Sequence, residues 1–364
     1  MKKGFNLFLA LILAMGIMMG CSNKKTPDAA PAPAEAAGEE AAQEQAGEPV
    51  KVVFITANNL GSQAFDDVVW AGIEAGCEKN GYECTPLQGI ELSMQADSVA
   101  VAIEEGANMV FFASSQEEVF SHDFVSQYPD VIWCDVDGSG GEYAQNLPDN
   151  LYVTTYKEQE AAFINGIFAA RMSESGQVAQ IQGSDSGTMV RFNAGFRAGV
   201  LYELGYDPTT VVVGFADVNK GYETAVMLHN QGIDVFACCA AGSNLGVFQA
   251  ADELGFLACG AADGQFHLMP SVIPASQVKT INKVCEELID AYAAGNFPYG
   301  QSQVRGIAEG GVDLIYTDKN DELLASIPQD VLDYLDEIRA KIISGEIVVP
   351  DSAEALDAFT SRAE

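Results

Sequence analysis

The chain has few basic residues. Only 18 of its 364 residues are Lys or Arg, whereas 52 are Asp or Glu, which gives a formal net charge of −34. Nucleic-acid backbones and anionic lipid surfaces attract clusters of Lys and Arg, so this charge argues against both as partners. The acidic residues are spread along the whole chain, as expected for the surface of a secreted protein that must stay in solution.

Motifs of nucleotide-dependent and hydrolytic enzymes are missing. The sequence contains neither a Walker A loop nor a dinucleotide-binding Gly-x-Gly-x-x-Gly. Residues 183–187 have the spacing of a nucleophile elbow, but Asp185 stands where the serine would be. Ser276 and Lys279 match Ser-x-x-Lys without its companion motifs, and we interpret Ser276 as a helix cap. We therefore expect no catalysis and no cofactor.

Histidine and cysteine show no metal-binding pattern. The three histidines are too scattered to form a spaced zinc motif, so we expect no metal site. Seven cysteines follow Cys21, and several lie in apolar runs that predict buried thiols. Only Cys77 and Cys84 are close enough in sequence to suggest a local disulfide.

The N-terminal segment is typical of secretion. Residues 1–20 have a basic start and an apolar core, as in a signal peptide, and the apolar run is shorter than the ~20 residues of a membrane-spanning helix. Met-Met-Gly-Cys at 18–21 resembles a lipobox, so we expect Cys21 to carry a lipid anchor on the extracytoplasmic face of the cell membrane. The alternative is a plain signal with a chance cysteine. Residues 21–49, rich in Ala, Glu, Pro and Gly, predict a disordered tether.

From residue 50 the chain alternates short apolar strands with amphipathic helices, which predicts a parallel α/β fold. The expected strands are 51–56, 83–87, 109–113, 131–137, 178–181, 211–215, 234–237 and 256–259. The expected helices include 92–105, 188–204, 218–231, 243–254, 276–294 and 329–343. A body of about 315 residues suits two lobes rather than one core.

The lobes would be joined by more than one crossover. We expect an N-terminal lobe of 50–155 plus about 262–298 and a C-terminal lobe of 156–261 plus about 299–360, with a cleft at their hinge. Parallel sheets bind ligands beyond the C-terminal ends of their strands. Candidate binding residues are therefore the polar residues that follow strands: Asn58, Asn59, Ser62, Ser114, Ser115, Asp137, Asp185, Asp217, Asp263 and Gln265.

Seven segments, in order, resemble the basic membrane protein family of bacterial substrate-binding lipoproteins, whose best-understood members are purine nucleoside receptors of ABC importers. The segments are 64–72, 128–138, 158–166, 183–199, 215–221, 241–248 and 309–312. The most specific is 183–199, which contains Arg-Phe-Asn-Ala-Gly-Phe-Arg-Ala-Gly. The resemblance implies a periplasmic-binding-protein type I fold, with two Rossmann-like lobes, and an ABC permease and ATPase as partners.

The resemblance also implies roles for individual residues. A purine base would lie between two aromatic rings, one from each lobe, which by position are Phe65 and Phe215; otherwise each is a core phenylalanine. Asp137 would accept hydrogen bonds from the base edge. Asp185 and Arg191 would face the cleft near a helix N-terminus, and Gly242 lies in a matched segment.

The sequence departs from the family pattern at three places. The acidic residue expected after the first strand is Thr56, Ala57 or Asn58, and in the ribose-gripping segment only a shifted Asp263 could take the acidic role. The lysine expected in a Ser-Val-x-Lys stretch corresponds to Pro274. We accordingly expect the ligand to be a nucleoside, a nucleobase or another flat heterocycle such as a flavin. A sensor that signals to a membrane receptor and a hydrolase remain alternative functions.

Overall fold

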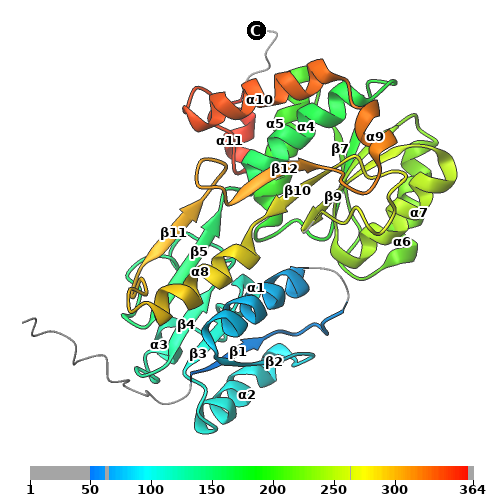
Figure 1. Ribbon diagram of the computed structural model, residues 1–364. Helices are drawn as coiled ribbons and strands as arrows, with labels where there is room; N and C mark the ends of the chain where they lie inside the picture. The colour runs from blue at the N-terminus through cyan, green and yellow to red at the C-terminus, as the bar shows by residue number, and fades with distance from the viewer. Residues whose placement is uncertain (1–49, 62–64, 263, 360–364) are drawn as a thin grey trace, which may run out of the picture. The chain divides into compact units, whose positions relative to one another are not determined.

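The computed structural model describes residues 50–61, 65–262 and 264–359 (Figure 1). The predicted signal peptide, the predicted tether and Cys21 lie outside these residues, as do Ser62 and Asp263. Within the described residues, no helix combines the length and the apolar character needed to cross a membrane.

Six parallel strands form the first sheet, in the order β11-β5-β4-β3-β1-β2. The strands are β1 (Lys51–Ile55), β2 (Glu83–Leu87), β3 (Met109–Phe112), β4 (Ile132–Asp135), β5 (Leu151–Tyr156) and β11 (Ser302–Arg305). The central strands β3 and β4 are buried along their whole length. Such continuous burial is typical of parallel strands that helices cover on both faces.

The second sheet also has six strands, in the order β12-β10-β9-β8-β6-β7, and only β10 and β12 run antiparallel. The strands are β6 (Val178–Gln182), β7 (Thr209–Val212), β8 (Val235–Cys239), β9 (Leu257–Ala262), β10 (Ala275–Lys279) and β12 (Val312–Tyr316). Two mainly parallel sheets confirm the predicted α/β class.

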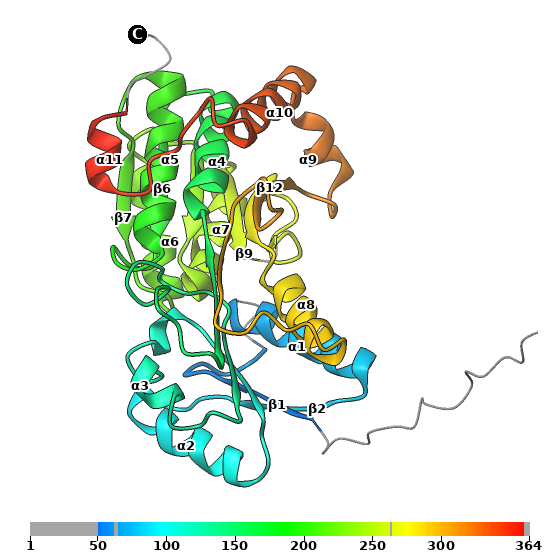
Figure 2. The same ribbon diagram turned by 90° about the vertical axis from the view of Figure 1, so that its left-hand side faces the viewer.

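Helices pack closely beside these sheets. The α-helices are α1 (Phe65–Asn80), α2 (Leu92–Glu104), α3 (His122–Val125), α4 (Glu158–Met172), α5 (Met189–Leu204), α6 (Val218–His229), α7 (Asn244–Leu254), α8 (Ile281–Ala293), α9 (Asp321–Ser326), α10 (Gln329–Ile343) and α11 (Ala353–Asp357). Helices α1 and α8 lie side by side, as do α4 and α5 (Figures 1 and 2). A side chain at Gly72 would collide with the backbone of Asn282, and one at Gly199 with that of Phe163, so glycine permits both close contacts.

Two expected elements differ from the structure. The helix expected at 276–294 begins only at Ile281, because residues 275–279 form β10 and pair with both β9 and β12. Ser276 is therefore a buried strand residue and not a helix cap. The strand expected at 211–215 is β7, which ends at Val212, so Phe215 lies beyond the strand. Strand β5 was not predicted.

The chain passes between the sheets along three neighbouring crossover segments. Lys157 N donates to Arg305 O (3.1 Å), Thr280 N to Gly311 O (2.9 Å) and Gly311 N to Gly306 O (2.8 Å). Strand β10, within the expected N-terminal lobe, pairs in the second sheet, and β11, within the expected C-terminal lobe, pairs in the first. Each of these two strands thus pairs in the sheet opposite to the one expected from its predicted lobe. The lobe boundaries themselves stay a prediction.

Cys77 and Cys84 are free thiols, so the disulfide that their spacing suggested is not formed. Burial raises the pKa of the Cys77 thiol to about 12. The thiol is therefore protonated at neutral pH and a weak nucleophile.

Candidate functional site

The loops after β1, β3 and β4 lie at one edge of the first sheet, because these strands are parallel neighbours. A predicted binding residue follows each of these strands. Asn58 follows β1, Ser114 begins the short helix η1 (Ser114–Gln116) after β3, and Asp137 follows β4. Helix α1 begins at Phe65 after the first of these loops.

Four charged side chains meet beside this edge. Lys279 Nζ lies 2.6 Å from Asp137 Oδ1 and 3.2 Å from Glu158 Oε1. Arg191 Nε donates to Glu158 Oε2 at 2.6 Å. We call Asp137, Glu158, Arg191 and Lys279 the charge cluster. It contains two carboxylates and two cations, so its charges balance.

The charge cluster is buried, and its members depend on one another. Glu158 is 0% exposed, and Asp137 and Lys279 are nearly enclosed. Burial raises the pKa of Asp137 to about 6, although the ammonium of Lys279 opposes this shift. Burial also acts to lower the pKa of Lys279, but the carboxylates of Asp137 and Glu158 outweigh it and hold that pKa above its ordinary value. Removing one partner would leave an uncompensated buried charge.

The charge cluster joins the two sheets. Asp137 follows β4 of the first sheet, whereas Lys279 is the last residue of β10 in the second. Arg191, in the first turn of α5, donates from Nη1 to the carbonyl of Ser139 at 3.1 Å. Lys279 directly precedes the crossover residue Thr280, and Glu158 directly follows the crossover residue Lys157. The loop after β4 is therefore bound to the second sheet beside the crossovers.

Three aromatic rings surround the Lys279 ammonium. Its Nζ lies 5.6 Å from the ring centre of Phe65, 5.3 Å from that of Tyr156 and 5.7 Å from that of Phe192. These distances are in the range of cation–π attraction. Tyr156 and Phe192 are buried, whereas Phe65 is partly exposed, so Phe65 is the ring that could stack on a flat polar molecule beside the charge cluster.

Phe215 lies in the loop between β7 and α6. Its ring packs directly on Gly183, where any side chain would collide with it, and 46% of the residue is exposed. The predicted pairing of the Phe65 and Phe215 rings around a ligand stays a prediction.

The remaining predicted binding residues are more dispersed. Asp185 is exposed after β6, and Asp217 caps α6 by accepting from Lys220 N at 2.9 Å. Gln265 is buried, and its Oε1 accepts from Asn244 Nδ2 (3.0 Å) and from Ala261 N (3.1 Å). Gly242 lies in the short helix η2 (Ala241–Ser243), against the carbonyl of Phe215. The structure thus brings Asp137, Arg191 and Phe65 together around Lys279 and Glu158.

Sequence reasoning missed Lys279 and Glu158. Lys279 was placed in a helix, and the family lysine was assigned to Pro274. The structure instead makes Lys279 the last residue of β10 and places it in the charge cluster. Glu158 opens the matched segment 158–166, which was the available signal for it.

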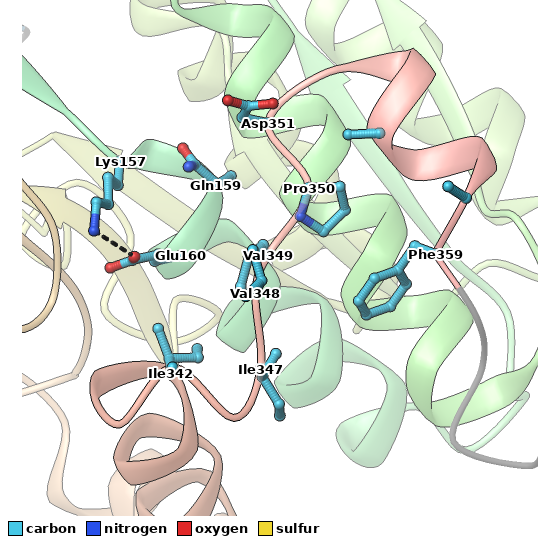
Figure 3. Close-up of a pocket in the computed structure, with 13 residues that line it drawn as sticks. Lys157, Gln159, Glu160, Ile342, Ile347, Val348, Val349, Pro350, Asp351 and Phe359 are labelled. Carbon is cyan, nitrogen blue, oxygen red and sulfur yellow. Dashed lines mark ion pairs between the residues drawn. The ribbon is translucent and has the colours of Figure 1, made fainter.

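A separate cavity of about 500 Å³ lies beside the N-terminus of α4 (Figure 3). Lys157 and Glu160, paired at 3.4 Å, line its polar side. Its apolar side comes from the C-terminal segment and includes Ile342, Ile347, Val349, Pro350 and Phe359. Glu158 faces the charge cluster, whereas Gln159 and Glu160 line this cavity.

Comparisons with known proteins agree with this architecture. The family described as "ABC transporter substrate-binding protein PnrA-like" matches residues 49–353. Basic membrane protein A2 of Borrelia garinii subsp. bavariensis is 25% identical over 320 residues, covering 86% of this chain and 92% of the relative. The crystal structure of an ABC transporter solute-binding protein from Aeropyrum pernix K1 has a TM-score of 0.75 at 23% identity and covers 85% of this chain and 96% of its own. An ABC transporter solute-binding protein from Conexibacter woesei has a TM-score of 0.68 at 21% identity, and the match covers 83% of this chain and 99% of that protein. These structural likenesses confirm the predicted type I fold.

Proposed function

The chain belongs to the family of PnrA-like ABC transporter substrate-binding proteins, and on that premise we propose that it captures a nucleoside or a similar flat heterocycle for an ABC importer. The observation that carries this proposal is the charge cluster with its three rings. It supplies the partly exposed Phe65 ring as a stacking surface, together with hydrogen-bond donors and acceptors, beside the strand ends where parallel sheets bind ligands.

The charges of the cluster favour an uncharged ligand. Asp137 and Glu158 are already balanced by Arg191 and Lys279. Asp66, another buried carboxylate, adjoins Phe65 in the chain. The three carboxylates and two cations leave one net negative charge here, and no excess positive charge, so a phosphate group would be repelled rather than attracted. We therefore propose that the protein binds nucleosides or nucleobases and rejects nucleotides.

The ligand would contact both lobes. Phe65 would stack on one face of the heterocycle and Phe215 on the other once the lobes close about the crossover segments. Asp137 would accept from the edge of the base, and Lys279 would donate to ribose hydroxyls, in place of the lysine first assigned to Pro274. Further contacts would come from Asn58, Ser62, Ser114, Asp185, Arg191, Asp217, Gly242, Asp263 and Gln265.

The predicted N-terminal features fit the same role. A lipid on Cys21 would hold the protein at the extracytoplasmic face of the membrane, and residues 21–49 would let the binding body reach the permease. The ATPase would act on the cytoplasmic side, and the binding protein itself would leave its ligand chemically unchanged.

Mass spectrometry of the small molecule released from gently purified protein tests this proposal. We expect an uncharged aromatic heterocycle, with or without ribose. A sugar, an amino acid or a nucleotide in stoichiometric amount would contradict the proposed ligand class. Conversion of the released molecule by fresh protein would contradict a purely binding role.

A further inference from the structure

The loop after β1 is tied to the start of α1 by one buried carboxylate. Asp66, which is 7% exposed, accepts from Thr56 Oγ1 at 2.7 Å through Oδ1 and from Asn58 Nδ2 at 2.8 Å through Oδ2. Thr56 Oγ1 in turn accepts from Asn58 N at 3.1 Å. Both oxygens of Asp66 are therefore used to hold the loop.

These bonds determine which end of the Asn58 amide faces outward. A carboxylate can only accept hydrogen bonds, so Asn58 must direct its NH₂ group at Asp66. The oxygen and nitrogen of an asparagine side chain are usually hard to tell apart, but the Asp66 carboxylate fixes which atom of Asn58 is the nitrogen. Asn58 is exposed, and its Oδ1 remains on the side away from Asp66 as a hydrogen-bond acceptor.

The backbone of the same loop is also fixed. Thr56 N donates to Leu87 O (2.9 Å), Ile90 N donates to Thr56 O (3.1 Å) and Gly89 N donates to Asn58 O (2.8 Å). Asp66 directly follows Phe65 and lies in the first turn of α1, where the helix dipole favours a negative charge. One residue thus sets the position of the Asn58 amide relative to the Phe65 ring.

We propose that Asp66 is a positioning residue that presents Asn58 Oδ1 as an acceptor, and that the site consequently selects heterocycles with an N–H at this edge. This inference rests on the proposed function and adds a selectivity rule to it. A heterocycle whose ring nitrogen carries a methyl group in place of that hydrogen would leave the Asn58 oxygen without a donor.

Three variants separate this role from a general loss of charge. Asp66→Asn lets the Asn58 amide adopt either orientation. The double variant Asn58→Asp/Asp66→Asn again presents only acceptor oxygens, because the amide of the new residue 66 can donate to the carboxylate at 58. Asp67→Asn is the matched control, since Asp67 is an adjacent first-turn carboxylate that accepts from Gly61 N instead.

Calorimetric titration with guanosine and 1-methylguanosine measures the selectivity, because the exocyclic amino group of both can still donate to Asp137. We expect the wild-type protein, the double variant and Asp67→Asn to prefer guanosine by about tenfold or more, the cost of leaving the Asn58 acceptor unpaired. Asp66→Asn should reduce this ratio toward one. An unchanged ratio in Asp66→Asn, or the same reduction in Asp67→Asn, would overturn the inference.

A ligand-free measurement distinguishes failure of this inference from failure of the proposed function. In nuclear magnetic resonance spectra, the Asn58 side-chain amide protons bonded to a carboxylate should move upfield in Asp66→Asn and stay in place in Asp67→Asn. Unchanged resonances in Asp66→Asn would overturn the positioning role. If wild-type protein binds neither nucleoside, the nucleoside proposal and the selectivity rule both fail, and the resonances still decide whether Asp66 positions Asn58.

Discussion

Lys279 and Asp137 are 142 residues apart in sequence, yet the Nζ of one lies 2.6 Å from the Oδ1 of the other. Lys279 ends a strand of the second sheet, whereas Asp137 follows a strand of the first. The bond places a positive charge among the rings of Phe65, Tyr156 and Phe192. It also links the loop after β4 to the end of β10, beside the crossover segments. The Lys279–Asp137 pair therefore both stabilises the fold and sets the charge at the candidate site.

Substitution of Lys279 should be costly to folding. Lys279→Met leaves Asp137 without its cation, and breaking a buried ion pair from one side costs about 3–5 kcal/mol. Urea unfolding measures this change. Lys283→Met, at an exposed position on α8, serves as the control and should change the free energy of unfolding by less than about 0.5 kcal/mol. Equal effects of the two substitutions would show that the Lys279 pair does not stabilise the fold.

Loss of either predicted stacking ring should weaken ligand binding. Phe65→Ala and Phe215→Ala should each reduce the binding free energy of a nucleoside by about 1–3 kcal/mol, as expected for one stacked base. Isothermal titration calorimetry gives the affinities, with Tyr299→Ala as a control for loss of an exposed ring elsewhere. Full affinity in both phenylalanine variants would remove these rings from the site.

Ligand affinity should depend on pH through Asp137. Burial raises the pKa of this carboxyl to about 6, so protonation begins as the pH falls toward that value. The protonated form accepts hydrogen bonds less well and no longer pairs with Lys279, so affinity should fall as the pH decreases through about 6. Asp137→Asn should bind more weakly and lose this dependence. A pH profile identical in the wild type and Asp137→Asn would rule out Asp137 as the titrating group.

Membrane attachment should require Cys21. Cys21→Ala removes the thiol that would carry the lipid, so the protein should move from the membrane fraction to the soluble extracytoplasmic fraction. Cys84→Ala removes a thiol from the folded body and should stay with the membranes. Immunoblots of fractionated cells distinguish the two. Retention of Cys21→Ala in the membrane fraction would disprove lipidation at this residue.

Much of the fold could be predicted from local patterns. Strand β2 and helix α10 have the predicted bounds, Glu83–Leu87 and Gln329–Ile343, because their composition and periodicity decide their structure. Strand β10 was missed because its sequence, Ala-Ser-Gln-Val-Lys, has little β propensity, and its structure depends on pairing with β9 and β12.

The candidate site likewise contains residues that local sequence patterns predict and residues that depend on distant partners. Phe65, Asp137 and Arg191 were predicted because they follow strands or lie in matched segments. Lys279 and Glu158 were missed because charged residues are usually exposed, and their burial depends on partners far away in sequence. Lys279 is 121 residues from Glu158, so no local pattern could reveal that pair.

A crystal structure of the protein with the small molecule that co-purifies with it tests the site most directly. We expect a flat ring stacked on Phe65, with its edge bonded to Asp137 and with Lys279 in contact. Binding of the molecule elsewhere, for example in the cavity between α4 and the C-terminal segment, with the charge cluster unchanged, would contradict the assignment of the charge cluster as the ligand site.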